Sequence, residues 1–430
     1  MDGRVRLSNK VRLIEGPERA LLVNLQNGKW ARLPNDLAKM ITSAAASEWV
    51  HANALSHAYQ SLGIDTCSME RMFDNLLRAG ILLRQGQDPP PGPREVFEAY
   101  IIVTDRCNLS CLTCSLSSRP IFPNNDLPTE TVLRIIDTIA HDRNAVFVIT
   151  GGEPLLRNDI EHILKHAFLK GRGISLQTNG VLLDEKTCQM VTRYVDWVEI
   201  SLDGADEESS APVRGKGAFS SVIAGIKRLK ALGFNRISTS MVINRFNAHK
   251  VEDYIKLNEQ LGIEYMLRQF HPIGRGFKNR DKLELVSDEV NNSLRTKAKK
   301  RIDEIGLAGH LQKVRNEMKA CENCGAGIRR IAILANGDVR PCASVLSQKA
   351  AMGNILDYDS LDDLLSQDFN EKLVASFGVD NREDCKECDV RYFCGYCLAD
   401  MPQFSDNIGP RIISDCKSHQ YDLQRIIWGN

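Results

Sequence analysis

The cysteines of this 430-residue chain are grouped rather than scattered. Disulfide-stapled domains are short, secreted and much denser in cysteine than this chain, which has 13 in all. In a reducing compartment, cysteines at such short spacings are typical ligands of a metal ion or a metal cluster. Cys67 and Cys188 stand apart from the groups. The grouped cysteines are Cys107, Cys111 and Cys114, then Cys321, Cys324 and Cys342, then Cys385, Cys388, Cys394, Cys397 and Cys416.

The remaining composition is that of an ordinary globular protein, with 43% hydrophobic and 26% charged residues. The 55 Lys and Arg residues balance the 55 Asp and Glu residues, so the whole chain has no attraction for nucleic acid or for an anionic membrane. No apolar run approaches the roughly 18 residues of a membrane helix, and the charged first residues lack the apolar core of a signal peptide. We therefore expect a cytoplasmic protein without a membrane partner.

Residues 1–88 have the pattern of a small domain in which strands precede helices and one short strand closes the unit. Met69–Ala79 carries apolar residues at helical spacing, and Asn27-Gly28 supplies a tight turn. This order resembles a winged helix-turn-helix domain, whose usual partner is DNA. Residues 1–90, however, hold 11 Lys or Arg and 9 Asp or Glu, and a net charge of +2 is a poor footprint for a duplex. The expected strands are Val11–Ile14, Ala20–Leu25 and Lys29–Leu33, closed by Ile81–Leu83.

After a proline-rich linker at residues 89–97, residues 98–285 alternate strands with helices. Six strands that are each separated by a helix predict a parallel sheet with right-handed crossovers, and we expect a partial, TIM-like (β/α)6 barrel. In such α/β folds the reactive groups gather at the carboxyl ends of the strands. Residues 286–320 predict a helical bridge with a solvated basic face, and residues 321–430 a cysteine-rich domain. The expected strands are Ala99–Thr104, Ala145–Thr150, Ile174–Gln177, Trp197–Leu202, Ile237–Ile243 and Tyr265–Phe270.

Cys107, Cys111 and Cys114 follow the first of these strands directly. Three thiolates within eight residues can bind three irons of a cubic [4Fe–4S] cluster, which leaves the fourth iron without a protein ligand. An open coordination position is reactive, as it is on a catalytic zinc ion. The spacing alone leaves a second interpretation open, a zinc site that is completed by a distant ligand.

A second motif, Thr-Gly-Gly-Glu-Pro at residues 150–154, follows the next strand. Together the two motifs resemble the radical S-adenosylmethionine (SAM) superfamily, over about residues 98–275. The resemblance implies that the open iron binds the amino and carboxylate groups of SAM. It also implies that reduction of the cluster cleaves SAM to a 5′-deoxyadenosyl radical, which takes a hydrogen atom from a substrate C–H bond. Further stretches that fit at strand ends are Gln177–Gly180, Ser201–Gly204 and Gly274-Arg275.

The same resemblance implies SAM contacts at the ends of several strands. Gly151 and Gly152 would admit the amino group because no side chain intrudes, and Glu153 would shape their turn. Ser201 would touch the ribose, and the guanidinium of Arg214 would bind the carboxylate bidentately. An ordinary loop for the glycines and a surface position for the arginine are the alternatives.

The C-terminal cysteines resemble the SPASM domain of peptide- and protein-modifying radical SAM enzymes, which holds two auxiliary [4Fe–4S] clusters. One departure is the two-residue gap between Cys394 and Cys397, where that family usually has three residues. It leaves open whether the first auxiliary cluster has four protein ligands or an open iron, and a zinc ribbon is the alternative for the domain. Cys67 and Cys188 remain as expected buried thiols. The resemblance assigns Cys321, Cys324, Cys342 and Cys397 to the first auxiliary cluster, and Cys385, Cys388, Cys394 and Cys416 to the second.

A small winged helix fused to such an enzyme resembles the precursor-recognition element of ribosomal peptide maturases. That resemblance implies a leader peptide bound as an added strand beside one of the strands within Val11–Leu33. The expected function is a peptide-modifying oxidoreductase that forms a cross-link, a Cys thioether, in a precursor peptide, with flavodoxin or ferredoxin as electron donor. A carbon–carbon cross-link, a sulfatase-maturase type of activity, and an iron–sulfur regulator that binds DNA through residues 1–85 are the alternatives.

Eleven thiolates on three four-iron clusters predict about 12 Fe per chain after anaerobic reconstitution. Replacing Cys107, Cys111 and Cys114 together by Ala should lower that content by about four Fe, because only one cluster loses its ligands. Iron and acid-labile sulfide assays measure the change, with Cys67→Ala as the control that keeps all the iron. An iron content unchanged by the triple replacement would contradict the assignment.

Overall fold

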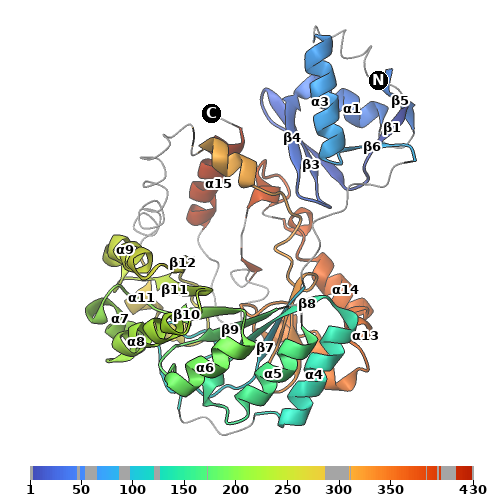
Figure 1. Ribbon diagram of the computed structural model, residues 1–430. Helices are drawn as coiled ribbons and strands as arrows, with labels where there is room; N and C mark the ends of the chain where they lie inside the picture. Colours follow the sequence, from blue (N-terminus) through green and yellow to red (C-terminus); the bar gives the residue numbers. More distant parts are fainter. Residues whose placement is uncertain are drawn as a thin grey trace.

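In the computed structural model, an α/β unit forms the base, and the N-terminal domain and the C-terminal helix α15 (Ile413–Ile427) lie above it (Figure 1). No helix in the part of the chain that is described is long and apolar enough to cross a membrane. The structure describes residues 3–45, 49–53, 65–86, 97–120, 126–171, 173–285, 309, 311–383, 385–394, 397–398 and 413–428.

Six parallel strands form the body of the sheet and confirm the expected partial barrel. Alternate strand residues, such as Ala99 and Ile101, are buried beneath the helices that cover one face of the sheet (Figure 1). In chain order the strands are β7 (Phe97–Ile102), β8 (Ala145–Thr150), β9 (Ile174–Thr178), β10 (Trp197–Ser201), β11 (Ile237–Ile243) and β12 (Glu264–Gln269). The connecting helices are α4 (Thr129–Asp142), α5 (Ile160–Lys170), α6 (Glu185–Tyr194), α8 (Ala218–Ala231) and α9 (Val251–Leu261).

Helix α7 (Glu207–Arg214) is an element that the sequence pattern does not predict, because Pro212 lies inside it. Proline has no N–H to donate within a helix and normally argues against one. The helix forms from a capping box, in which the side chains of Asp206 and Ser209 each accept the other's backbone N–H. Its last residue, Arg214, is thereby placed near the end of the barrel strands. Two short helices, α10 (Arg275–Lys278) and α11 (Arg280–Leu283), follow β12.

Three strands of the C-terminal region extend the same sheet beyond β7. Strand β13 (Arg330–Ile333) pairs parallel with β7, and β14 (Asp338–Arg340) and β15 (Gly353–Asn354) follow antiparallel. Helix α13 (Leu361–Leu365) packs against α4, and α14 (Asp368–Ala375) follows it. The cysteine-rich region therefore shares one continuous sheet with the barrel. Short 3-10 turns lie at Pro154–Leu156, Ala248–Lys250, Gln348–Ala350, Ile355–Asp357, Val379–Asn381 and Arg391–Phe393.

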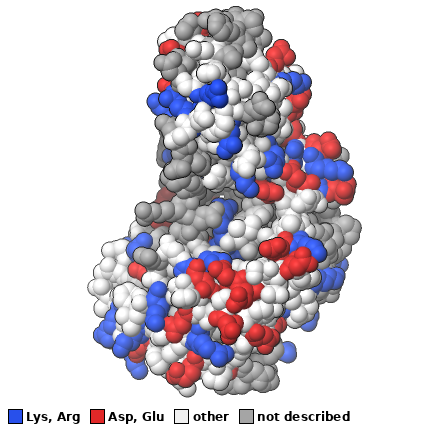
Figure 2. All heavy atoms as spheres, turned by 90° about the vertical axis from the view of Figure 1, so that its right-hand side faces the viewer, with Lys and Arg blue, Asp and Glu red and all other residues white. Residues whose placement is uncertain are grey.

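The N-terminal domain contains two small antiparallel sheets. One is a meander of the three expected strands, now β2 (Val11–Glu15), β3 (Arg19–Asn24) and β4 (Trp30–Pro34). Residues 46–48 and 54–64 are outside the described residues, so the winged helix-turn-helix assignment stays a prediction. Acidic side chains lie among the basic ones on the face of the molecule in Figure 2. The second sheet is β5 (Val50–His51), β1 (Arg4–Leu7) and β6 (Leu82–Arg84), and the helices are α1 (Asn35–Ala44) and α3 (Thr66–Arg78).

Cys67 is exposed on α3, so the expectation that it is a buried thiol is wrong, whereas Cys188 on α6 is buried as expected. The reason is helix geometry. Met69 and Phe73 face the core of the N-terminal domain, and a residue two positions before Met69 points about 200° away around the helix. Cys67 therefore faces solvent.

Strand β3 is buried on both faces, which accounts for its continuous apolar sequence. Ala20 and Leu22 point into the core of the N-terminal domain, whereas Leu21 and Val23 pack against the C-terminal region. The N-terminal domain is therefore docked through one face of its meander. The residues it meets are Val390, Tyr392, Phe393, Leu423 and Ile427.

Residues 311–317 are helical, in agreement with the expected helical bridge. The basic stretch Arg295–Arg301 and most of the proline-rich linker lie outside the described residues. The domain boundaries at 88, 97, 285 and 320 therefore stay predictions.

Asp142, the last residue of α4, connects the barrel to α13. Its carboxylate accepts the backbone N–H of Leu361 at 2.7 Å and of Asp362 at 3.3 Å, where α13 begins. Replacing Asp142 with Ala should lower the free energy of unfolding by about 1 kcal/mol, because a helix start loses its acceptor. Urea unfolding measures the change, with Arg134→Ala on the exposed side of α4 as the control. An equal effect of the two substitutions would contradict this role.

Candidate cluster and cofactor site

The first three predicted ligands lie on the loop that follows β7. Cys107 and Cys111 are buried, and Cys114 is partly buried. Burial raises the pKa of the Cys107 thiol to about 11 and also raises the pKa of Cys111. A nearby cation is therefore needed for these sulfurs to exist as thiolates in this environment.

Arg275 holds this loop in place from the far end of the barrel. Its guanidinium donates hydrogen bonds to the carbonyl oxygens of Cys111 at 2.7 Å, Ser117 at 3.2 Å and Ser118 at 2.7 Å. Gly274 precedes it with a φ of +56°, and a side chain there would collide with the backbone of the cysteine loop. The Gly-Arg pair after β12 thus supports the loop that carries the cysteines.

Gly151 and Gly152 lie directly against the start of the cysteine loop. A Cβ atom on Gly151 would sit 2.5 Å from the carbonyl oxygen of Thr104, and one on Gly152 would overlap the carbonyl of Arg106. The N–H of Gly152 donates to the Thr104 oxygen at 2.7 Å. The close packing of two backbones therefore requires glycine at both positions. Contact of these residues with the SAM amino group stays a prediction.

Glu153 is fully buried and joins the ends of β8 and β9. Its Oε1 accepts the backbone N–H of Leu155 at 3.1 Å and the hydroxyl of Thr178 at 2.8 Å, and its Oε2 accepts the N–H of Asn179 at 2.7 Å. Burial raises the pKa of Glu153 to about 7, although these donors act in the opposite direction. Both carboxylate oxygens thus serve neighbouring protein groups, and the SAM contact assigned to Glu153 stays a prediction.

Asn179 is a site residue to which the sequence analysis assigns no role. Its side-chain amide donates to the sulfur of Cys107 at 3.6 Å and to the side-chain oxygen of Asn108 at 2.7 Å. The available signal is its place, one residue beyond β9. Asn179 connects the end of β9 to the cysteine loop.

Arg214 points toward the cysteine loop and is paired with Asp203. Its Nε lies 2.8 Å from the Asp203 carboxylate, and its Nη1 donates to the sulfur of Cys111 at 3.8 Å. Burial alone would lower the pKa of Arg214, but the charges of Asp203 and Cys111 raise it overall. Asp203 also accepts the backbone N–H of Val242 at 2.7 Å, so it is scaffolding for this arginine. Ser201, at the end of β10, is partly buried, and its ribose contact stays a prediction.

The donor set at the end of β7 fits a [4Fe–4S] cluster. Three thiols on one loop are the ligands such a cluster takes, and iron supplies the positive charge that buried thiolates need. Asn179 and Arg214 add N–H donors to the sulfurs of Cys107 and Cys111, the kind of outer contact that orients metal ligands.

The first auxiliary set lies at the open end of the β13–β14 hairpin. Cys321 and Cys324 precede β13, and Cys342 follows β14. Burial raises the pKa of Cys321 and of Cys342, and the nearby Cys324 adds to both shifts. Cys324, Cys342 and Cys397 also pack against one hydrophobic cluster. The structure thus brings these four thiols into one neighbourhood, and their role as ligands stays a prediction.

The second auxiliary set lies beside α15. Cys388 and Cys394 pack against the hydrophobic cluster under the N-terminal meander. Burial raises the pKa of Cys388, and the nearby thiols of Cys416 and Cys385 raise it further. Cys416 itself is exposed on α15.

Within the described residues, no three His, Cys, Asp or Glu side chains form a group that could hold a single metal ion. In a [4Fe–4S] cluster each iron takes one thiolate, so the ligands belong to different metal atoms. The chemistry of the donor set, which is thiols alone, carries the assignment to clusters.

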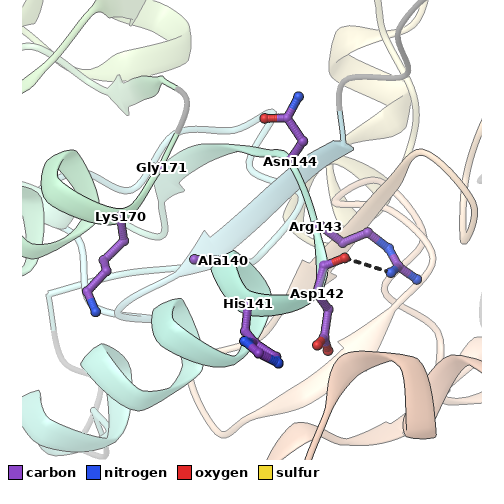
Figure 3. A pocket seen from close by; sticks show the side chains of 7 residues that line it. All are labelled: Ala140, His141, Asp142, Arg143, Asn144, Lys170 and Gly171. Carbon is purple, nitrogen blue, oxygen red and sulfur yellow. Dashed lines mark hydrogen bonds between the residues drawn. The ribbon is translucent and has the colours of Figure 1, made fainter.

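A hollow of about 520 Å³ lies at the opposite end of the barrel, beside the amino end of β8 (Figure 3). It is lined by the last residues of α4 and α5, and Asp142 and Arg143 in its wall contact α13. It belongs to the junction between the barrel and the C-terminal region and has no cysteine in its lining.

Family models match two parts of the chain. Residues 101–257 match the radical SAM superfamily, and residues 321–389 match an iron–sulfur cluster-binding domain, SPASM. The chain therefore belongs to the radical SAM superfamily. Within that superfamily, it is a protein whose radical SAM domain is followed by a SPASM domain.

Two curated relatives illustrate the range of similar proteins. Mycofactocin maturase MftC of Mycolicibacterium smegmatis is 31% identical over 271 residues, which are 59% of this chain and 66% of that relative. A probable GTP 3′,8-cyclase of Saccharolobus islandicus is 29% identical over 66% of this chain and 92% of its own length. The similarity therefore covers part of the chain in each case.

Two solved structures share the fold. Streptococcus suis SuiB bound to S-adenosylmethionine is 18% identical, with a TM-score of 0.57 over 92% of this chain and 96% of SuiB. The protein anSMEcpe with bound AdoMet is 20% identical, with a TM-score of 0.60 over 76% of this chain and 98% of its own. At these identities the comparison establishes the fold.

The raised pKa of Glu153 predicts a pH-dependent stability. The folded protein binds this proton more tightly than the unfolded chain, in which the value is 4.5, so stability should fall as pH rises from about 4.5 to about 7. Glu153→Gln should remove that slope and destabilise the protein at pH 5 by about 1–3 kcal/mol, because a buried N–H loses its acceptor.

Urea unfolding of the reduced, metal-free protein at pH 5 and pH 8 measures both effects. Glu185→Gln, at the exposed start of α6, is the control. The difference between the wild type and Glu153→Gln should narrow at pH 8. A difference that stays constant with pH would show that Glu153 does not titrate in this range.

Proposed function

We propose that this chain is a peptide maturase that cleaves SAM and installs a cross-link, a Cys thioether, in a ribosomally synthesised precursor peptide. The observation that carries the proposal is the combination of two features in one rigid framework. Three buried thiols lie at the carboxyl end of β7, and a small β-sheet domain is docked on the cysteine-rich region. The protein is proposed to work in the cytoplasm with three [4Fe–4S] clusters and an electron donor such as flavodoxin or ferredoxin.

The named relatives support this choice. MftC is called a mycofactocin maturase, SuiB has been solved with its precursor peptide SuiA, and anSMEcpe has been solved with a peptide named Kp18Cys. All three act on or bind peptides by name, and the structural likeness to SuiB includes the N-terminal part of this chain because it covers 92% of it.

The leader peptide is proposed to bind at an edge of the N-terminal meander. Strand β3 is paired with β2 on one side and with β4 on the other, so β3 has no free edge. Added strands need a row of unpaired backbone groups, and β2 and β4 are the outer strands of this sheet. The candidate edges are therefore Val11–Glu15 and Trp30–Pro34.

The residues at the strand ends give the site its order. When bound, the cluster and SAM supply an electron and a radical that removes one hydrogen atom from a substrate carbon. Arg214 is held by Asp203, and Asn179 is held through Glu153, so the groups that face Cys111 and Cys107 are oriented in advance. Formation of a thioether breaks one C–H and one S–H bond, and it releases a proton and one electron, which an auxiliary cluster would accept.

Two other products of the same machinery remain candidates. A carbon–carbon cross-link needs the same radical at a different substrate position. A sulfatase-maturase type of activity is favoured by no feature of the N-terminal domain. A DNA-binding regulator is opposed by the net charge of +2 over residues 1–90, with 11 basic and 9 acidic residues.

Co-expression with the short peptide encoded beside this gene tests the proposal. Mass spectrometry should find the peptide lighter by two hydrogens, and alkylation should no longer label the Cys that forms the thioether. Replacement of Cys107, Cys111 and Cys114 by Ala should abolish both changes, whereas Cys67→Ala should leave them intact. A peptide of unchanged mass, together with deoxyadenosine formation by the same enzyme, would contradict the proposed cross-linking.

A further inference from the structure

Helix α15 turns two different faces to two different parts of the chain. Cys416, Gln420 and Gln424 recur every four residues and therefore lie on one stripe of the helix. The side-chain amides of Gln420 and Gln424 donate to the carboxylate of Asp389 at 3.3 Å and 3.0 Å. Asp389 directly follows Cys388. The stripe that carries Cys416 is thus directed toward the loop of the second auxiliary cysteines.

The other stripe of α15 packs on the N-terminal domain. Leu423 and Ile427 are buried in the hydrophobic cluster that includes one face of β3. The ring of Trp428 lies over Gly16, where an added Cβ would be 2.8 Å from it. The apolar side of α15 is therefore covered in part by the meander.

The last turn of α15 is closed by arginines from other segments. Arg32 of β4 donates to the carbonyl oxygens of Ile427 at 3.1 Å and Trp428 at 2.6 Å, and Arg315 donates to that of Ile426 at 2.7 Å. The final carbonyls of a helix have no partners within it, and positive charge is favourable there. The N-terminal domain thus supplies a hydrogen-bonding cap as well as an apolar surface.

Trp30 connects the same strand to the segments that lead into the cysteines. Its indole N–H donates to the carbonyl of Met318 at 3.1 Å, and its ring meets Phe393 edge-on at 5.2 Å. Phe393 directly precedes Cys394, and Met318 lies shortly before Cys321. Strand β4 therefore contacts the chain next to cysteines of both auxiliary sets.

We propose that the N-terminal domain completes the second auxiliary cluster site by holding α15, and with it Cys416, against the loop of Cys385, Cys388 and Cys394. Arg32 and Trp30 are positioning residues for that site. Docking of the domain and assembly of the cluster then stabilise each other, because each favours the same arrangement of α15. Deletion of the domain would accordingly remove this cluster while leaving the loop after β7 intact. That leader binding is coupled to the same cluster rests on the proposed function.

The test is the iron content of the full-length protein carrying Trp30→Ala together with Arg32→Ala. Reconstituted iron should fall from about 12 to about 8 Fe per chain, because one of three clusters loses its fourth ligand. The electron paramagnetic resonance spectrum of the reduced protein should lose the component that is also lost in Cys385→Ala with Cys388→Ala. The matched control is Arg6→Ala with Trp49→Ala, which removes a stacked Arg–Trp pair at 4.8 Å elsewhere in the same domain.

A variant that is folded by circular dichroism and keeps about 12 Fe, with all spectral components, would overturn the proposal. If the double variant does not fold, Gly16→Ala decides, because its methyl group only displaces Trp428. The same loss of iron is expected from it, and full retention is again the contrary result. No peptide enters these assays, so their outcome is independent of whether the protein cross-links a precursor.

Discussion

Strand β7 is hydrogen-bonded on both sides, to β8 and to β13, and the positions of the cysteine loops follow from this pairing. The loop of Cys107 to Cys114 begins where β7 ends. The hairpin of β13 and β14, which is flanked by Cys324 and Cys342, is attached to the same strand. An edge strand would present unpaired backbone groups and could be displaced. The distance between the radical-generating loop and the first auxiliary set is therefore set by a sheet and not by a linker.

Around the cysteine loop, buried carboxylates are balanced by N–H donors that also reach the thiols. Glu153 accepts the backbone N–H of Asn179, whose side chain contacts Cys107. Asp203 pairs with Arg214, which contacts Cys111. A buried carboxylate without such partners would be strongly destabilising. The polar groups at the ends of β8, β9 and β10 thus depend on one another, which restricts substitution of any one of them.

The barrel was predictable because its strands are short apolar runs separated by amphipathic helices, and β8 and β11 begin and end where the sequence pattern places them. The cysteine ligands were predictable from spacing. Helix α7 was not, because Pro212 hides a helix that depends on its capping box. The roles of Arg275 and Asn179 depend on contacts between segments far apart in the sequence, and no local pattern records such contacts. Cys67 was placed wrongly because its exposure depends on which side of α3 faces the core.

The burial of β3 on both faces links recognition to structure in the N-terminal domain. A meander that folded alone would expose Leu21 and Val23, and the strand would read as an alternation of apolar and polar residues. Its unbroken apolar run, Ala20–Val23, requires a second partner, and the C-terminal region supplies it. One face of the meander is thereby occupied by its own core and the other by the cysteine-rich region. What remains for an incoming peptide is an edge of the sheet, where backbone hydrogen bonds provide affinity and neighbouring side chains provide selectivity. A peptide bound there lies on an element that already contacts α15, so recognition and the second auxiliary set share the same structural support.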